Sequence, residues 1–313
     1  MTGGSMTRPP LLRPLLRRLV LSLGLAVGLA SGLAAGLALP AAAETVFYQP
    51  LNRDRSLNRQ QWQQIWQQAR ARGFDRVIVQ WSAYGDERFE QDDWLLASLA
   101  EADRQGLALV IGLAADPAYF QTVLQPGWKD RFNDYWAGLQ RQSLAQQQRL
   151  LPRLRQLGLP VAGWYLPAEL SDRLFAEAPR REAIRSQLQQ LASRLDQPLH
   201  ISAYSTGQLS PDANGAWLQQ LQDAGLQVWW QDGEGIAELP ALVRRAYLQA
   251  VPCPVGIVRE AFRQTSTAGA PFTAVPATPQ PPLACHPNAV FALQYLPWAT
   301  ALRPTPPPPR RDI

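Results

Sequence analysis

Beyond its N-terminal segment, this 313-residue sequence has almost none of the net positive charge that a nucleic-acid-binding protein needs. Lys129 is the only lysine, and no run of basic residues lies beyond the N-terminal segment. The formal net charge of +5 comes from 30 basic and 25 acidic residues, but residues 1–43 hold four arginines and no acid. Without that segment the balance is 26 minus 25, or +1. The basic surface of a nucleic-acid binder is therefore missing, and we expect no such partner.

Histidine is scarce as well, and the best-known sequence motifs of nucleotide-binding proteins and serine hydrolases are absent. The two histidines, His200 and His286, stand far apart and lack the spacing of metal ligands. There is no Gly-x-Ser-x-Gly elbow, no Walker loop, and no Gly-x-Gly-x-x-Gly after a strand. These absences argue against a metal-dependent deacetylase, a serine hydrolase and a nucleotide-binding protein. We expect neither a metal nor an organic cofactor.

The N-terminus has the three parts of a secretory signal. Four arginines precede an apolar run over Leu19–Leu39, and three alanines ending at Ala43 form a small-residue cleavage site. Residues 1–43 are therefore predicted to be a signal peptide, and the protein to be exported, either periplasmic or secreted. An uncleaved anchor, which would add a membrane contact, and a twin-arginine signal at Arg17-Arg18 are the alternatives.

Cysteine is almost absent, since Cys253 and Cys285 are the only two. In an exported protein an even pair usually forms a disulfide, so we predict a Cys253–Cys285 bridge, with a catalytic thiol as the alternative. Both residues precede apolar strands, which places them at the N-terminal ends of those strands.

What the sequence does have is an eightfold alternation of short apolar strands with helical segments. The expected strands are Val46–Leu51, Val77–Trp81, Leu107–Leu113, Val161–Leu166, Leu199–Tyr204, Val228–Gln231, Val255–Val258 and Val290–Leu296. This pattern predicts an α/β protein with a (β/α)8 TIM barrel over residues 44–300. Before the last strand, Arg263–Asn288 is rich in proline, alanine and threonine, so a loop partly folded over the rim should replace the seventh helix. Residues 301–313 are expected to be a disordered, proline-rich tail.

Two glutamates stand where a barrel carries its chemistry. Glu169 and Glu260 follow the fourth and seventh strands, and the working face of such a barrel lies at the strand C-termini. Glycosidases use a pair of carboxyl groups on either side of the scissile bond. We expect Glu169 to be the general acid/base and Glu260 the nucleophile or base. The alternative is a structural ion pair at the rim, such as Glu260 with Arg263.

Further polar and aromatic residues at the strand ends suggest a sugar-binding groove. Aromatic rings offer an apolar face to a pyranose, and tyrosine and tryptophan add a polar group. The expected substrate-binding residues are Trp81, Tyr165, Tyr204, Trp230, Asp232 and Tyr295. The function predicted from these patterns is a glycoside hydrolase acting on a poly- or oligosaccharide. A non-catalytic glycan-binding barrel that assists polysaccharide assembly or export is the alternative.

Several motifs in order also carry a resemblance to a known family. They are Phe47-Tyr-Gln-Pro-Leu-Asn, Val79-Gln-Trp-Ser, Gly112-Leu-Ala-Ala-Asp-Pro, Gly163-Trp-Tyr-Leu-Pro-Ala-Glu, Trp230-Gln-Asp-Gly and Glu260-Ala-Phe. From about Glu44 to Trp298 the chain resembles the bacterial domain of unknown function 4434 family, whose members look like exported, glycoside-hydrolase-like TIM barrels. The resemblance implies the fold and the class, and it brings no substrate and no catalytic residue.

Overall fold

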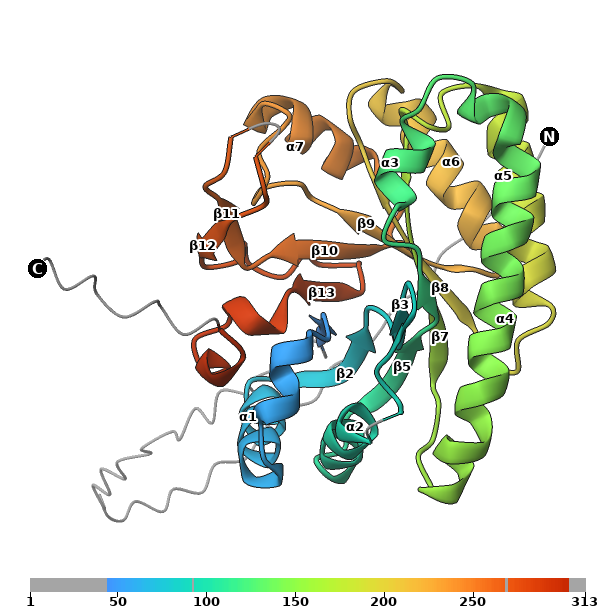
Figure 1. The fold of residues 1–313 in the computed structure, drawn as a ribbon. Helices are drawn as coiled ribbons and strands as arrows, with labels where there is room; N and C mark the ends of the chain where they lie inside the picture. The colour runs from blue at the N-terminus through green and yellow to red at the C-terminus, as the bar shows by residue number, and fades with distance from the viewer. Residues whose placement is uncertain (1–43, 92, 268–269, 304–313) are drawn as a thin grey trace, which may run out of the picture. The chain divides into compact units, whose positions relative to one another are not determined.

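The folded part of the protein is an eight-stranded parallel barrel (Figure 1). A computed structural model describes residues 44–91, 93–267 and 270–303. The barrel strands are β1 (Glu44–Tyr48), β2 (Phe74–Val79), β5 (Ala108–Gly112), β7 (Gly163–Ser171), β8 (Leu199–Tyr204), β9 (Gln227–Gln231), β10 (Gly256–Glu260) and β13 (Asn288–Phe291). They pair in chain order, and β13 closes the ring against β1. The TIM barrel predicted from the sequence is confirmed.

Helices surround most of the barrel. They are α1 (Arg59–Ala71), α2 (Trp94–Arg104), α3 (Tyr119–Val123), α4 (Phe132–Gln156), α5 (Ala178–Ala192), α6 (Pro211–Asp223) and α7 (Ala241–Ala250). Helix α1 shows why they form: Trp62, Ile65, Trp66 and Ala69 recur every three or four residues, and all four are buried. At its start Asn58 and Gln61 form a reciprocal capping box.

The barrel interior holds a small core of its own. Its residues are Phe47, Ile78, Val110, Tyr165, Trp229, Val258 and Ala289. Because successive side chains on a strand point to opposite faces, their neighbours Val46, Val77 and Ile257 join the larger core outside the barrel. Within the interior, the Trp229 indole donates a hydrogen bond to Nδ1 of buried His200 at 3.1 Å.

A proline-rich segment takes the place of a helix between β10 and β13. The described residues there contain no helix, but β11 (Phe262–Gln264) and β12 (Ala274–Pro276) pair as an antiparallel hairpin. Arg259 on β10 points away from the barrel interior, is buried, donates to the carbonyl of Gln280 and pairs with Glu44. The predicted replacement of the helix after the seventh barrel strand, β10, by a proline-rich segment is therefore confirmed for the described residues, and this segment covers the outer face that such a helix would have covered.

The predicted disulfide is present. Cys253 and Cys285 are bonded, with their Cα atoms 5.2 Å apart. They lie just before β10 and β13, which are neighbours in the barrel, so the bridge ties the start of one strand to the start of the next.

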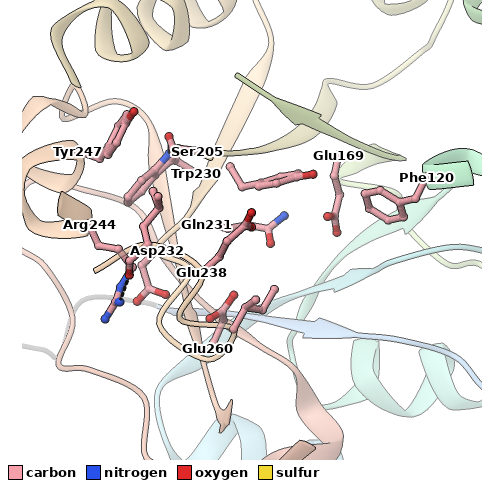
Figure 2. A pocket seen from close by; sticks show the side chains of 14 residues that line it. Phe120, Glu169, Ser205, Trp230, Gln231, Asp232, Glu238, Arg244, Tyr247 and Glu260 are labelled. Atoms are coloured by element: carbon pink, nitrogen blue, oxygen red, sulfur yellow. Dashed lines mark hydrogen bonds between the residues drawn. The ribbon is translucent and has the colours of Figure 1, made fainter. Parts of the chain in front are cut away.

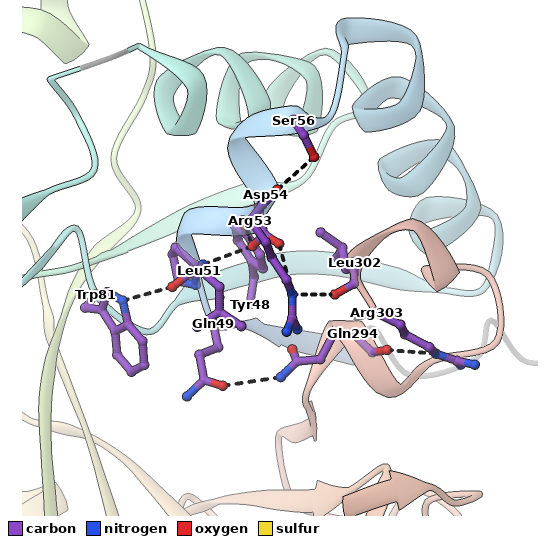
Figure 3. A network of polar contacts seen from close by, with 11 residues as sticks. Tyr48, Gln49, Leu51, Arg53, Asp54, Ser56, Trp81, Gln294, Leu302 and Arg303 are labelled. Atoms are coloured by element: carbon purple, nitrogen blue, oxygen red, sulfur yellow. Dashed lines mark hydrogen bonds and ion pairs between the residues drawn. The ribbon is translucent and has the colours of Figure 1, made fainter. Parts of the chain in front are cut away.

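The barrel domain extends slightly beyond its predicted end at residue 300. The 3-10 helix η4 (Thr300–Leu302) buries Leu302, whose carbonyl accepts a hydrogen bond from Arg53 at 3.1 Å (Figure 3). Arg303 donates to three backbone carbonyls of residues 294–296. These contacts keep residues 301–303, which follow the predicted boundary, packed on the barrel.

The predicted signal peptide (1–43) and the rest of the predicted tail (304–313) lie outside the described residues. In the part of the chain that the structure describes, no helix combines the length and the apolar character needed to cross a membrane.

A buried carboxylate fixes the turn after β1 (Figure 3). Asp54, in the 3-10 helix η1 (Asn52–Ser56), accepts hydrogen bonds from the Tyr48 hydroxyl at 2.9 Å and the Leu51 backbone N–H at 3.0 Å. Burial raises the pKa of Asp54, and these two bonds oppose the rise. The contacts hold the chain in a tight turn next to the strand end that carries Gln49.

Candidate active site

The two-residue repeat of the barrel strands determines which side chains form the floor of the candidate site. Moving two residues along a strand from an interior core residue leads to the next inward position, one layer closer to the C-terminal face. The pairs are Phe47 and Gln49, Ile78 and Gln80, Trp229 and Gln231, Val258 and Glu260, and Ala289 and Phe291. All five residues of the upper layer line one cavity above the core.

Glu169 reaches the same layer by a different route. The pairing of β7 with β8 shifts register between Tyr165 and Glu169, where four residues of β7 match two of β8. Pro167 lies inside this irregularity, and proline cannot donate to a strand ladder, which is why a bulge is expected there. The Tyr119 hydroxyl holds the far side of the bulge by donating to the Glu169 carbonyl at 2.7 Å.

Two adjoining cavities share the glutamate pair, and Figure 2 shows the residues of the first. The first, which we call the acidic cavity, has a volume of about 190 Å³. Its polar and aromatic wall residues are Phe120, Glu169, Tyr204, Ser205, Trp230, Gln231, Asp232, Glu238, Arg244, Tyr247 and Glu260. The second, of about 370 Å³, we call the aromatic cavity. Its walls include Gln49, Gln80, Trp81, Tyr84, Phe120, Glu169, Gln231, Glu260, Phe262, Phe272, Phe291 and Tyr295.

Both predicted catalytic residues therefore lie in one depression at the strand C-termini. In Figure 2 the Glu169 and Glu260 carboxyl groups and the Gln231 amide face the same space. The alternative ion pair of Glu260 with Arg263 is not formed, because Arg263 pairs with Glu234 instead. Glu260 accepts a hydrogen bond from the Gly235 backbone N–H.

Burial raises the pKa values of both glutamates in the protein without a ligand. The pKa of Glu260 rises to about 8, first because the group is buried and next because of the negative charges of Asp232 and Glu169. The pKa of Glu169 is also raised by burial, and a hydrogen bond from Gln231 opposes the rise. The raised pKa of Glu169 suits the general acid role expected for it from the sequence. The raised pKa of Glu260 does not suit the ionised state that a nucleophile or base needs.

Asp232 stands beside this pair. It lines the acidic cavity, and burial raises its pKa to about 6, against a hydrogen bond from the Glu234 backbone N–H at 3.0 Å. A cluster of carboxyl groups with raised pKa values in a cavity is typical of a site that transfers protons.

The expected aromatic residues divide between the cavities, with one exception. Tyr204 and Trp230 line the acidic cavity, and Trp81 and Tyr295 line the aromatic cavity. Tyr165 is absent from both walls, because it belongs to the barrel core, where its hydroxyl lies 2.8 Å from the Ser202 hydroxyl. The sequence predicted that it binds substrate, but the structure places it in the core layer below the cavities, two positions before Pro167, which lines the aromatic cavity.

Sequence reasoning missed two groups at the site. One is the set of strand-end glutamines, Gln49, Gln80 and Gln231, whose signal was their position two residues after a core residue. The other is a set of exposed apolar residues around the mouth of the aromatic cavity: Tyr84, Phe120, Ile236 and Phe272. Monomeric proteins rarely expose several large apolar side chains together without a binding role.

At this site, no three potential metal ligands of the described residues lie close enough together to hold one ion. The one such group of three in the described part of the chain is Cys253, Cys285 and His286, and its two sulfurs are bonded to each other.

Comparison with known proteins identifies the family of this barrel. The model of the family described as "Domain of unknown function (DUF4434)" matches residues 44–280. The chain belongs to this family. It is also 34% identical over 279 residues to the "Uncharacterized protein YbcH" of Escherichia coli K12, a match covering 82% of this chain and 92% of that protein.

The similarity to solved structures is more distant. A "putative alpha-L-fucosidase" of Bacteroides thetaiotaomicron aligns over 80% of this chain and 83% of its own, with 16% identity and a TM-score of 0.46. The D-psicose 3-epimerase of Clostridium cellulolyticum H10 aligns over 69% and 72%, with 11% identity and a TM-score of 0.36.

Proposed function

We propose that this member of the family is an exported glycoside hydrolase in which Glu169 and Glu260 form the catalytic pair. One observation carries the proposal: two glutamates with raised pKa values line both of the cavities that adjoin at the C-terminal face of the barrel. A glycosidic bond lying across this junction would place one sugar in each cavity, with a carboxyl group available to the leaving oxygen.

The protonation of the pair fits this chemistry. Hydrolysis needs one carboxyl group that still holds a proton and one that acts as base or nucleophile. Burial and the mutual repulsion of the two glutamates keep a proton in the site at neutral pH. Two criteria assign the acid differently. The placement of Glu169 on the fourth barrel strand and Glu260 on the seventh favours Glu169 as the acid. The pKa of about 8 favours Glu260 as the acid.

The test is a screen of oligosaccharides with the mature protein, followed by Glu169→Gln and Glu260→Gln on any sugar that is cleaved. A positioned acid or base contributes about 100- to 10,000-fold, so each variant should lose that much turnover. Glu182→Gln, an exposed glutamate on α5, is the matched control and should cleave normally. Azide rescue of the corresponding alanine variants distinguishes the roles in a retaining enzyme, because the nucleophile variant gives a glycosyl azide of inverted configuration and the acid/base variant one of retained configuration. Near wild-type cleavage by both glutamine variants would refute this catalytic pair.

A non-catalytic glycan-binding barrel is the second candidate. The observation that favours it is the exposed apolar rim of Tyr84, Phe120 and Phe272, which can hold a chain whether or not a bond is cleaved. Equal glycan binding by the wild type and both glutamine variants, with no cleavage of any bound sugar, would establish this function instead.

Export is part of the proposal. The Cys253–Cys285 bridge supports it, because disulfides persist in oxidising compartments and are rare in the cytosol.

A further inference from the structure

Gln80 carries an unsatisfied acceptor on the wall of the aromatic cavity. Its side chain is only 8% exposed, and its Oε1 has no hydrogen-bond partner among the described residues. Burying a carbonyl oxygen without a donor destabilises a folded protein, and most buried polar groups are therefore paired. The oxygen itself has almost no accessible surface, but the Gln80 side chain lines the cavity, so a rotation of its terminal amide would turn Oε1 toward a donor supplied by a ligand.

Neighbouring glutamines offer complementary groups. The Gln294 amide donates to Gln49 Oε1 at 3.3 Å, which leaves the Gln49 N–H groups as donors. The Gln231 side chain is hydrogen-bonded to Glu169. Three amides from β1, β2 and β9 therefore surround the position next to the glutamate pair, and hydroxyl groups both donate to and accept from amides.

Charge restricts what can occupy this cavity. No lysine, arginine or histidine is among the residues that line it, in contrast to the acidic cavity with Arg244. Both oxygens of Asp116 are engaged, one by the Ala118 N–H and the other by the Tyr135 hydroxyl, each at 2.8 Å. A uronate, sulfate or phosphate group would lose its hydration here and find no cation in exchange.

We infer that the aromatic cavity binds an uncharged sugar unit and that Gln80 Oε1 accepts a hydrogen bond from one of its hydroxyls. The aromatic walls, among them Trp81 and Tyr295, would pack on the apolar faces of the ring. The inference rests on the proposed function, since it names the class of sugar bound at that same site, but it does not depend on cleavage.

The experiment is calorimetric titration of two panels of oligosaccharides into the mature protein. One panel is neutral, with cello-, manno-, galacto- and chito-oligosaccharides, and the other is acidic, with oligogalacturonates and alginate oligomers. At least one neutral series should bind, and no acidic series should bind more tightly. Gln80→Leu should weaken that binding about tenfold, the value of one lost hydrogen bond. Gln80→Met, whose side chain is unbranched, is a second variant that controls for poor packing of the leucine side chain.

The melting temperature separates a ligand-binding role from a structural one. Because Gln80 Oε1 has no partner in the protein, Gln80→Leu or Gln80→Met should melt at the wild-type temperature or above it. Asn214→Ala, which removes another buried and unpaired amide on α6, is the matched control and should leave binding unchanged.

Three outcomes would overturn the inference: acidic oligomers bound more tightly than neutral ones, full neutral-sugar affinity in both Gln80 variants, or no neutral series bound at all. Cleavage is scored separately. A neutral sugar that binds through Gln80 but is never cleaved rejects the hydrolase and keeps the inference. Cleavage of acidic glycans alone keeps the hydrolase and rejects the inference.

Discussion

The backbone N–H of Gly235 donates a hydrogen bond to the Glu260 carboxyl group, which joins the loop after β9 to the end of β10. Only glycine permits this approach, because a Cβ on Gly235 would lie 2.9 Å from Glu260 Oε2 and 2.6 Å from the Phe262 carbonyl oxygen. The bond favours the ionised carboxylate, yet burial and the charge of Asp232 outweigh it. Ionising Glu260 therefore costs the folded protein stability.

A pH dependence of stability follows from Glu260. Its pKa of about 8 lies above the ordinary 4.5, so the folded state holds the proton more tightly and the contribution to stability is lost as pH rises between these values. Glu260→Gln keeps an acceptor for the Gly235 N–H and cannot ionise. The melting temperature of the variant relative to the wild type should therefore rise steadily from pH 4.5 to about 8. Parallel melting curves across this range would show that Glu260 ionises normally.

Phe272 should contribute to glycan binding without contributing to stability. Its side chain is 55% exposed at the mouth of the aromatic cavity, where a bound chain would cover it. Covering part of a phenylalanine ring gives about 1 kcal/mol, so Phe272→Ala should weaken binding about fivefold. The loss should be larger for longer oligosaccharides.

The matched control for this variant is Leu242→Ala on α7, which is exposed and lines neither cavity. Both variants should melt within a degree or two of the wild type, because exposed substitutions change stability little. Equal affinity of Phe272→Ala and Leu242→Ala for every oligosaccharide length would exclude Phe272 from the binding surface.

The barrel was predictable because its strands are apolar and alternate with amphipathic helices. The boundaries were less so. The fourth strand was expected to end at Leu166 before Pro167, but a bulge absorbs the proline and β7 continues to Ser171. The eighth was expected to run to Leu296, but β13 ends at Phe291 and Leu293–Tyr295 form a 3-10 turn.

The site could be predicted only in part, because local sequence patterns show which residues end a strand but not which side chains from different strands come together. Glu169 and Glu260 were identifiable because each follows an apolar strand, and that local pattern is visible in sequence. The raised pKa of Glu260 depends on Asp232 and Glu169, which come from other strands, and on burial by the loop after β9. The spacing of residues along the sequence does not show which side chains from different strands come together. The bulge after Tyr165 that brings Glu169 to the cavity was hidden in the same way.

The Tyr48 hydroxyl should be a measurable part of barrel stability. It donates to Asp54, which is 1% exposed, also accepts from the Leu51 N–H and lies 3.8 Å from Arg53 Nε. Tyr48→Phe removes one donor from a buried charge and should lower the free energy of unfolding in urea by about 1 to 3 kcal/mol. Tyr84→Phe, at the exposed mouth, is the control and should change it by less than about 0.5 kcal/mol. Equal effects of the two substitutions would show that the Tyr48–Asp54 bond adds no stability.

The disulfide should stabilise the domain by restricting the unfolded chain. Cys253 and Cys285 are 32 residues apart, and closing a loop of that length contributes about 3 to 4 kcal/mol in the chain-entropy model. The Cys253→Ser/Cys285→Ser double variant should therefore unfold at a clearly lower urea concentration than the oxidised wild type. Reducing the wild type should bring its transition to that of the variant, which separates the bridge from any effect of the serines. Titration of the denatured, unreduced protein should find no free thiol, and two reactive thiols per chain would contradict both the bridge and the oxidising compartment proposed for the protein.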